Sequence, residues 1–309
     1  MEQEATKIAR RSRGHPSLLS RTRGLLRRLD LQARKRLGQH FLIDQGVLET
    51  IVRAAGLTPD DVVIEIGPGL GVLTTELARQ AGWVVAVELD TRLAAALKQT
   101  LASVDNVTII NGDILRVDPV ALLEEPRTGL PQATEDGSPS YKVVANLPYY
   151  ITSAVIRRFL EASVRPRLMV VMVQKEVAEA IVARPGRMSL LSVSVQFYGE
   201  PAIVGYVAAG SFYPPPEVDS AILKIDLHPE PVVAVGDSEG FFGLVRAGFA
   251  APRKQIANSL AQGLGSSKAE VLPLLEKAAI VPRRRAETLA LSEWARLWQV
   301  LSQARQPSC

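Results

Sequence analysis

The sequence predicts an α/β fold with one large domain and a smaller all-helical one after it. Short apolar runs with the pattern of buried strands alternate with helical patterns as far as about residue 231, which is typical of a mostly parallel sheet. The strand patterns then stop and only helical patterns follow. A chain of 309 residues, 47% of them hydrophobic, is long enough for both parts.

The composition argues against membrane spans and against metal sites built from cysteine or histidine. No uninterrupted apolar run approaches the roughly 18 residues that a span needs. The single cysteine, Cys309, is the last residue, and the three histidines are scattered. We therefore expect no metal site and no membrane, and a reducing, cytoplasmic location.

Positive charge is concentrated at the N-terminus. Residues 1–36 hold eleven Lys and Arg against three acids, a net charge of +8, which leaves −4 for the rest of the +4 chain. Without sustained periodicity, residues 1–34 are interpreted as a flexible basic arm that favours a polyanionic partner. A disordered, solvated tail is the alternative. Glu2 and Glu4 argue against an organellar transit peptide.

The first part of the large domain predicts a ligand loop. Asp44 can cap a helix over residues 44–55. A strand over residues 61–66 leads directly into glycines at 67, 69 and 71, and a helix over residues 72–80 follows. Glycines at alternate positions allow a tight turn and the close approach of a ligand. A turn that merely happens to be rich in glycine is the alternative.

Acidic residues follow the next two strands, predicted over residues 83–87 and 107–111. Glu88, about 20 residues past the glycine loop, is placed to accept hydrogen bonds from ribose hydroxyls. Glu65, just ahead of Gly67, would repel a pyrophosphate. A nucleoside without phosphates therefore suits the loop, and S-adenosylmethionine is the commonest such cofactor. Asp113 either reads an adenine or only caps a helix.

The strand over residues 142–145 runs directly into Asn146, Leu147, Pro148 and Tyr149. In an open α/β sheet, ligands bind at the carboxyl ends of the strands. An amide followed by proline and tyrosine indicates a slot for a flat, hydrogen-bonding group. An ordinary asparagine turn is the alternative for this tetrapeptide alone.

The remainder of the large domain carries further helices and strands. Residues 124–140 read as a polar surface insertion, and three prolines from Pro214 fix where Phe212 and Tyr213 point. The other elements predicted are helices over residues 152–162 and 174–183 and strands over residues 168–173, 190–197, 202–207 and 221–225.

The second domain is predicted from about residue 232. Amphipathic helices are expected over residues 239–250, 253–262, 268–278 and 292–303. Basic residues recur here and could line one groove for a phosphate backbone together with the arm, although a solvated surface is the default reading. The candidates are Arg246, Arg253, Lys254, Arg283 and Arg284.

Taken together and in order, these motifs resemble the KsgA family, the S-adenosylmethionine-dependent dimethyladenosine transferases of small-subunit ribosomal RNA. The resemblance runs from about Arg36 to the C-terminus, close to nine-tenths of the chain. It rests on residues 37–42 (LGQHFL), 65–71 (EIGPGLG), 88–90 (ELD), 112–115 (GDIL), 146–151 (NLPYYI), 173–178 (VQKEVA), 212–221 (FYPPPEVDSA) and 253–260 (RKQIANSL).

The resemblance implies a domain organisation and a reaction. Residues 35–231 would form a Rossmann-like class I methyltransferase domain with a mixed, mostly parallel seven-stranded sheet, and residues 232–309 a helical domain for RNA recognition. The reaction would be N6,N6-dimethylation of two adjacent adenosines in a loop near the 3′ end of 16S rRNA. The partner would be an assembling 30S particle, and the enzyme a monomer.

The resemblance also implies roles for single residues. His40 stands where the family usually has asparagine, and a neutral imidazole could still donate one hydrogen bond to the cofactor. Phe212 would close the face of the base opposite Tyr149. The implied cofactor residues are Gln39, His40, Leu42, Gly67, Gly69, Glu88, Leu89, Asp113, Ile114 and Asn146; the implied catalytic residues are Asn146, Leu147, Pro148, Tyr149 and Phe212.

Two rival functions share this scaffold. One is an Erm-type methyltransferase of large-subunit rRNA, against which the Leu37-Gly38-Gln39 start and the long helical tail argue. The other is a non-catalytic nucleic-acid-binding relative, against which Asn146 and Glu88 argue, because both chemical motifs are intact.

Overall fold

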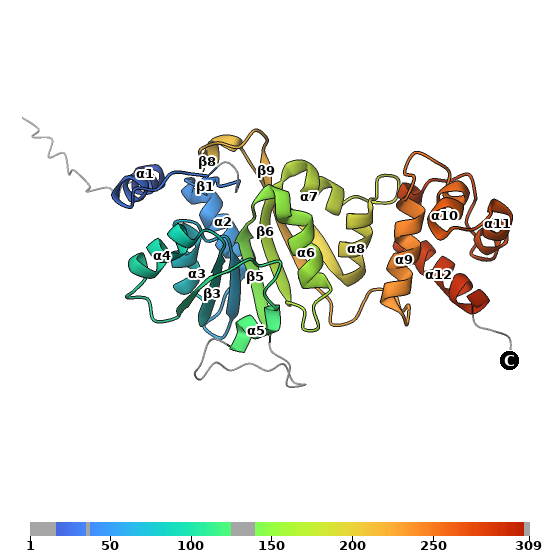
Figure 1. The fold of residues 1–309 in the computed structure, drawn as a ribbon, viewed down its shortest axis with the longest axis horizontal. Helices are drawn as coiled ribbons and strands as arrows, with labels where there is room; N and C mark the ends of the chain where they lie inside the picture. Colours follow the sequence, from blue (N-terminus) through green and yellow to red (C-terminus); the bar gives the residue numbers. More distant parts are fainter. Residues whose placement is uncertain (1–16, 35–37, 125–139, 306–309) are drawn as a thin grey trace, which may run out of the picture.

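A computed structural model describes residues 17–34, 38–124 and 140–305. Its centre is a seven-stranded sheet with helices around it, and a group of helices extends from one end of the sheet (Figure 1). No helix within these ranges is long and apolar enough to cross a membrane.

The strand order of the sheet is β4-β3-β2-β5-β6-β9-β7. The first five strands in this order are parallel, β9 runs antiparallel to β6, and β7 runs antiparallel to β9. The predicted mixed, mostly parallel sheet is therefore confirmed. The strands are β2 (Val62–Ile66), β3 (Trp83–Glu88), β4 (Val107–Asn111), β5 (Tyr141–Asn146), β6 (Leu168–Gln174), β7 (Gly199–Val207) and β9 (Ser220–Leu227).

Both faces of the sheet are covered, so its central strands are apolar on both sides. Ile64 of β2 packs in one buried cluster with Phe159 of α6, whereas Val63 packs in a second cluster with Ile51 of α2. The helices around the sheet are α2 (Gln45–Ala55), α3 (Val72–Ala78), α4 (Thr91–Thr100), α5 (Pro119–Glu124), α6 (Thr152–Leu160), α7 (Lys175–Ile181) and α8 (Leu190–Tyr198).

The strand predicted over residues 190–197 is wrong, because this segment is helix α8. Its sequence alternates apolar with polar residues, which is the period of a strand. The helix begins at a capping box in which the Ser189 and Ser192 side chains each accept from the other residue's backbone N–H. Gln196 then donates to the carbonyls of Ile181 and Ala183 at the end of α7, both at 2.9 Å. Capping and tertiary contacts outweigh the alternation here.

The basic arm is not uniformly without structure. Helix α1 (Leu18–Arg28) packs against the body through Leu18, Thr22 and Leu26, which are all buried. The polar Thr22 interrupts this helical stripe, which is why the sequence shows no apolar period. The prediction of a flexible segment through residue 34 is therefore wrong for α1, and residues 1–16 lie outside the described ranges.

The four helices predicted after residue 232 are all present. Phe197 of α8 stacks on Phe241 of α9 at 5.0 Å and meets Phe242 edge-on at 5.1 Å, so this group shares its core with the sheet. The boundary at residue 232 remains a prediction. The helices are α9 (Ser238–Phe249), α10 (Ile256–Leu264), α11 (Lys268–Lys277) and α12 (Leu291–Arg305).

Helices α1, α4 and α5 and a small two-stranded ribbon were not predicted. In the ribbon, β1 (Phe41–Leu42) pairs with β8 (Phe212–Tyr213), so two segments far apart in the sequence lie side by side above the sheet (Figure 1). Most of the predicted insertion over residues 124–140 falls outside the described ranges. Single 3₁₀ turns are η2 (Tyr149–Ile151), η3 (Ala209–Ser211) and η4 (Ala286–Thr288).

Candidate functional site

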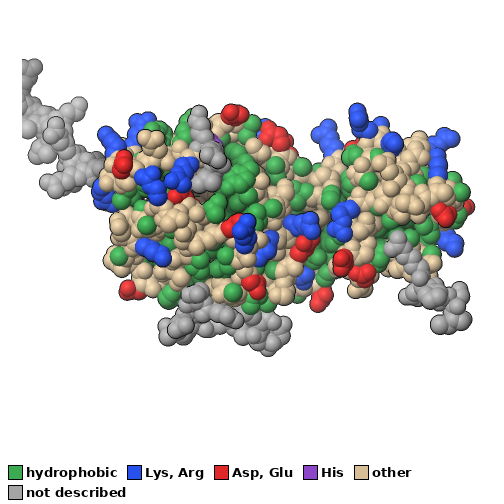
Figure 2. Space-filling model, in the orientation of Figure 1, with side chains coloured by type: hydrophobic (Ala, Val, Ile, Leu, Met, Phe, Trp, Pro, Cys, Tyr) green, Lys and Arg blue, Asp and Glu red, His purple; other side chains and the backbone are tan. Residues whose placement is uncertain are grey.

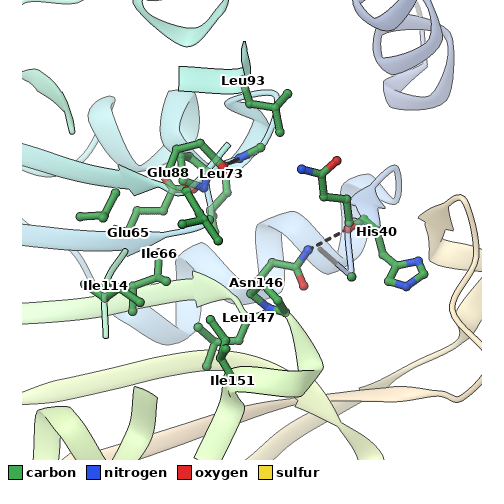
Figure 3. Close-up of a pocket in the computed structure, with 18 of the residues that line it drawn as sticks. His40, Glu65, Ile66, Leu73, Glu88, Leu93, Ile114, Asn146, Leu147 and Ile151 are labelled. Carbon is green, nitrogen blue, oxygen red and sulfur yellow. Dashed lines mark hydrogen bonds between the residues drawn. The ribbon is translucent and has the colours of Figure 1, made fainter. Parts of the chain in front are cut away.

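A pocket opens at the carboxyl ends of the parallel strands (Figure 3). The turns after β2, β3, β4 and β5 form its walls, and the segment before β1 closes one side. This is the edge where open α/β sheets bind ligands. Every segment that the sequence assigned to the cofactor therefore borders one cavity.

The glycine loop supplies a backbone wall. Gly67 and Gly69 have φ angles of 65° and 59°, a region that side chains disfavour. A Cβ on Gly69 would also lie 3.2 Å from the Phe41 ring. Both glycines are required by the turn itself, and the absent side chains leave the pocket open.

Glu88, at the end of β3, faces this loop. Its Oε2 accepts a hydrogen bond from Gly69 N at 3.1 Å, and its Oε1 accepts one from Asp90 N at 2.8 Å. Burial raises the pKa of the Glu88 carboxyl, although these two N–H donors oppose the rise. The carboxylate is thus held rigidly, with acceptor capacity left for a ligand hydroxyl.

Glu65 is the acid for which the described residues provide no complete set of partners. It lies in β2, is 1% exposed and lines the pocket, yet its Oε2 has no hydrogen-bond partner in the described structure. Burial raises its pKa to about 8, against the opposing effect of the Thr74 hydroxyl and with a further rise from the negative charge of Glu88. The sequence interpretation used Glu65 only to exclude a pyrophosphate and missed it as a candidate binding group. A buried acid directly before a glycine loop was the signal.

Asp113, Ile114 and Leu89 border the pocket from the strand ends beyond Glu88. Asp113 Oδ1 accepts from Leu115 N at 3.0 Å, which is the local capping role left open above. Its other oxygen is 3.5 Å from Arg116 Nε. Ile114 is buried, whereas Leu89 is 47% exposed and forms part of the rim. Capping does not prevent Asp113 from contacting a ligand, because a carboxylate accepts several hydrogen bonds.

Asn146 ends β5 with its amide orientation fixed. Its Nδ2 donates to the His40 carbonyl at 3.1 Å (Figure 3). A carbonyl oxygen can only accept a hydrogen bond, so the NH₂ group of the Asn146 amide must face the His40 carbonyl. Asn146 Oδ1 therefore faces the pocket as an acceptor. Among the described residues, no group donates to the neighbouring Leu147 carbonyl. Two acceptors therefore stand together at this strand end.

Tyr149 is held at two points. Its hydroxyl forms a 2.6 Å hydrogen bond with Ser220 Oγ on β9, and its ring lies 6.0 Å from the His40 ring at an interplanar angle of 20°. Ser220 is completely buried. The sequence interpretation missed Ser220, because nothing local to the 212–221 motif indicates which side chain it meets.

Two sequence expectations near Tyr149 need correction. Phe212 is 2% exposed, packs in the core with Leu42 and does not border the pocket, so it cannot cover a bound base in this arrangement. His40 Nδ1 lies 2.8 Å from the Pro214 carbonyl, and the imidazole points away from Asn146 (Figure 3). The contact of His40 with Asn146 is made by its backbone, and its ring does not take the predicted position of a cofactor donor.

Gln39 and Leu42 keep places consistent with their assignment, since both line the pocket. Gln39 Nε2 donates to Asp90 Oδ2 at 3.3 Å, and its Oε1 accepts from Arg34 N at 2.8 Å. Arg34 also pairs with Asp90 at 3.2 Å. The segment after α1 is therefore bonded to the residue that holds Glu88.

The basic candidates of the C-terminal helices divide into two groups. Arg246, Arg253, Lys254 and Arg283 are exposed. The loops that carry Arg253 and Arg283 lie together, because Ile256 N donates to Arg284 O at 2.6 Å. Arg284 is only partly exposed, and its role as an RNA contact stays a prediction. Its guanidinium pairs with both Glu293 oxygens, at 2.5 and 3.0 Å, and thereby fixes the start of α12.

Known proteins are similar in sequence to this chain over most of its length. A family model described as "Ribosomal RNA adenine dimethylase" matches residues 30–297. A Dehalococcoides mccartyi protein named "Ribosomal RNA small subunit methyltransferase A" is 53% identical over 291 residues, which are 94% of this chain and 96% of the relative. A Moorella thermoacetica protein of the same name is 47% identical over 283 residues, 91% of this chain and 96% of the relative.

Two solved structures share the fold over 85% of the chain. The 23S rRNA methyltransferase ErmE has a TM-score of 0.65 at 30% identity, and all of its chain is covered. A dimethyladenosine transferase from Plasmodium falciparum has a TM-score of 0.69 at 24% identity, with 98% of its chain covered.

Proposed function

The chain belongs to the ribosomal RNA adenine dimethylase family, and from this premise we propose that it dimethylates N6 of two adjacent adenosines in a loop near the 3′ end of small-subunit rRNA. The observation that carries the proposal is the pair of acceptors at the end of β5. Asn146 Oδ1 and the Leu147 carbonyl match the two N–H groups of an adenine amine.

The pocket beside these acceptors fits S-adenosylmethionine. The unpartnered oxygen of the Glu65 carboxyl can accept a hydrogen bond from an ammonium group, Glu88 can accept from ribose hydroxyls and Asp113 from an adenine amine. Gly67, Gly69 and Gln39 would line the same ligand, with Leu89 and Ile114 flanking its base. When bound, this cofactor would supply an electrophilic methyl group on a sulfonium, which a nucleophile can attack while the neutral thioether leaves.

Asn146 and Leu147 make the amine a better nucleophile. The lone pair of an adenine amine is delocalised into the ring. Two acceptors that draw both N–H bonds to one side favour a tetrahedral nitrogen and direct its lone pair away from themselves. Fixing this geometry before reaction can contribute about 7–11 kcal/mol through proximity and orientation. The product loses its extra proton to solvent, so no protein base is needed.

Tyr149 and Pro148 hold the base in place. Pro148 precedes the 3₁₀ turn and fixes the chain direction, and the Tyr149 ring offers a face on which the base stacks. Stacking of this kind is worth about 1–3 kcal/mol per base. Ser220 holds Tyr149 by its hydroxyl. The base must leave its own stack to enter, which favours a single-stranded loop as the target.

Basic surfaces at both ends of the molecule support a long RNA contact. Lys and Arg side chains gather around α1 at one end of the molecule and over the C-terminal helices at the other (Figure 2). We expect loss of three cations from either surface to lower the dependence of RNA affinity on salt by about two units of log Kd per log [salt]. The variants are Arg21, Arg27 and Arg28→Gln on α1, and Arg253, Lys254 and Arg283→Gln on the helical loops.

A matched control removes three cations from helix ends at the opposite edge of the sheet, which should leave both affinity and salt dependence unchanged. The control residues are Arg53, Arg79 and Lys98. Equal effects of all three triple variants would mean that only net charge matters and that neither basic surface contacts RNA.

Transfer of radiolabelled methyl groups to undermethylated small subunits, with the modified nucleotides mapped, tests the function directly. Label on N6 of two adjacent adenosines is expected. Label confined to large subunits would favour the Erm-type reaction, and no label would favour a non-catalytic relative. The 53% identity to a small-subunit enzyme, against 30% to ErmE, supports the first outcome. We further propose that the enzyme acts as a monomer on assembling 30S particles in the cytoplasm.

A further inference from the structure

Tyr150 is an exposed aromatic side chain at the mouth of the pocket. It lines the pocket and is 60% exposed. Its ring lies along the backbone of Gly38, since a Cβ on that glycine would be 3.5 Å from Tyr150 Cδ1. Among the described residues, no group hydrogen-bonds to its hydroxyl and no ring or cation stacks on it.

A second tyrosine with equal exposure is fully engaged. Tyr206 on β7 is also 60% exposed, but Lys175 Nζ lies 5.4 Å above its ring and its hydroxyl donates to Glu179 at 3.3 Å. An aromatic ring left in water gives up the favourable free energy of burial. At Tyr206 the contacts with Lys175 and Glu179 compensate for this loss, whereas the described residues provide no such contacts to Tyr150.

The 3₁₀ turn sends consecutive tyrosines in different directions. Residues in such a turn are rotated by about 120° from their neighbours. Tyr149 therefore points inward, with its hydroxyl on Ser220, while Tyr150 remains outside. One base inside the pocket and the next nucleotide outside it would thus each meet a tyrosine.

We propose that Tyr150 is the stacking platform for the nucleotide next to the adenosine being methylated. This inference rests on the proposed function. When the target base enters the pocket, its neighbour loses a stacking partner, and an exposed aromatic ring at the mouth replaces it. Stacking requires only the face of the base, so the neighbour on that side can be adenine, dimethyladenine or another base. One platform therefore serves both adenosines in turn.

The test measures binding of a synthetic stem–loop RNA that contains the two adjacent adenosines. Tyr150→Ala should raise Kd about 5- to 150-fold, the range expected for one stacked base. Tyr150→Phe should retain affinity, because stacking needs the ring and not the hydroxyl. Tyr206→Ala is the matched control for an equally exposed ring and should bind like the wild type.

A second RNA series identifies the contact. An abasic residue placed on the 5′ or the 3′ side of the target should, in one of the two positions, abolish the difference between wild type and Tyr150→Ala. Wild-type affinity in Tyr150→Ala, or the same loss on both abasic RNAs, would overturn the proposal. Failure of the proposed function is distinguishable, because the wild-type protein itself would then not methylate small subunits. S-adenosylmethionine binding checks that each variant is folded.

Discussion

Both edges of the sheet bury ionisable side chains, but only one edge provides them with a full set of partners. At the amino edge, Lys142 Nζ donates to Asp61 at 2.9 Å and to the carbonyls of Ala55 and Gly56 at 2.9 and 2.7 Å. Asp61 also accepts from Thr58 N at 2.7 Å. At the carboxyl edge, four residues further along the chain, Glu65 has an oxygen without a partner.

The two acids respond to burial in opposite ways. Burial would raise the pKa of Asp61, but Lys142, the Thr58 N–H and Arg167 outweigh it and lower the pKa. At Glu65 burial dominates and the pKa rises to about 8. The difference teaches that a buried ionisable group with a full set of partners stabilises the fold, whereas one that lacks partners is available to a ligand.

The largest effect is expected from breaking the paired edge. Lys142→Met leaves two carbonyls without their donor and removes the ammonium from Asp61, at a cost of about 3–5 kcal/mol in the free energy of unfolding. Urea unfolding measures this. Lys98→Met, the same exchange at an exposed position of α4, should change stability by less than about 0.5 kcal/mol. Equal losses in the free energy of unfolding in both variants would show that the buried partners of Lys142 do not stabilise the fold.

At the open edge, Asn146→Ala should impair chemistry and not folding. Loss of an acceptor that acts in the transition state is expected to lower turnover at least about a hundredfold, in line with other transition-state hydrogen bonds. Single-turnover methyl transfer measures the chemical step, with S-adenosylmethionine binding and urea unfolding as controls. Transfer near the wild-type rate would contradict the role of Asn146.

Glu65→Gln should change how stability depends on pH. Between the ordinary pKa of 4.5 and the folded value of about 8, the unfolded chain is ionised while the folded protein keeps its proton. Stability conferred by that proton is therefore lost as pH rises through this window. Glutamine has no proton to lose, so its stability relative to the wild type should rise by about 2 kcal/mol from pH 5 to pH 7. A difference that is constant with pH would show that Glu65 is ionised in the folded protein.

The smallest effect is expected where a neighbouring strand supports the open edge. Ser220→Ala and Tyr149→Phe each remove one hydrogen bond of 2.6 Å, so each should lower kcat/KM about fivefold, near 1 kcal/mol. The double variant should lose no more than either single one. Additive losses would mean that Ser220 does not act through Tyr149. Ser194→Ala, which removes a bond within α8, is the control.

Features set by local sequence were predicted well. The seven strands of the main sheet, the glycine loop and the Asp44 cap depend mostly on neighbours within a few residues, and the structure confirms them. Helix α8 was mistaken for a strand because its capping box and its contact with α7 outweigh an alternating pattern.

Side-chain direction could not be predicted, because its causes lie far away in the sequence. Phe212 lies in the core because its strand, β8, pairs with β1, where its partner is Leu42, 170 residues earlier in the sequence. Arg284 forms an ion pair with Glu293, and no sequence motif predicts this pair. In both cases the sequence indicated what the side chain could bind, but a contact with a distant residue determined where the side chain points.

The fixed amide of Asn146 also makes the pocket a chemical filter. Since its amine side is committed to the His40 carbonyl, the group that meets the substrate can accept a hydrogen bond but cannot donate one. An inosine at the target position would bring a carbonyl oxygen against Oδ1, and two acceptors repel. An RNA with inosine at the target position should therefore bind more weakly than the adenosine RNA. A competition assay between the two RNAs would measure this difference in affinity.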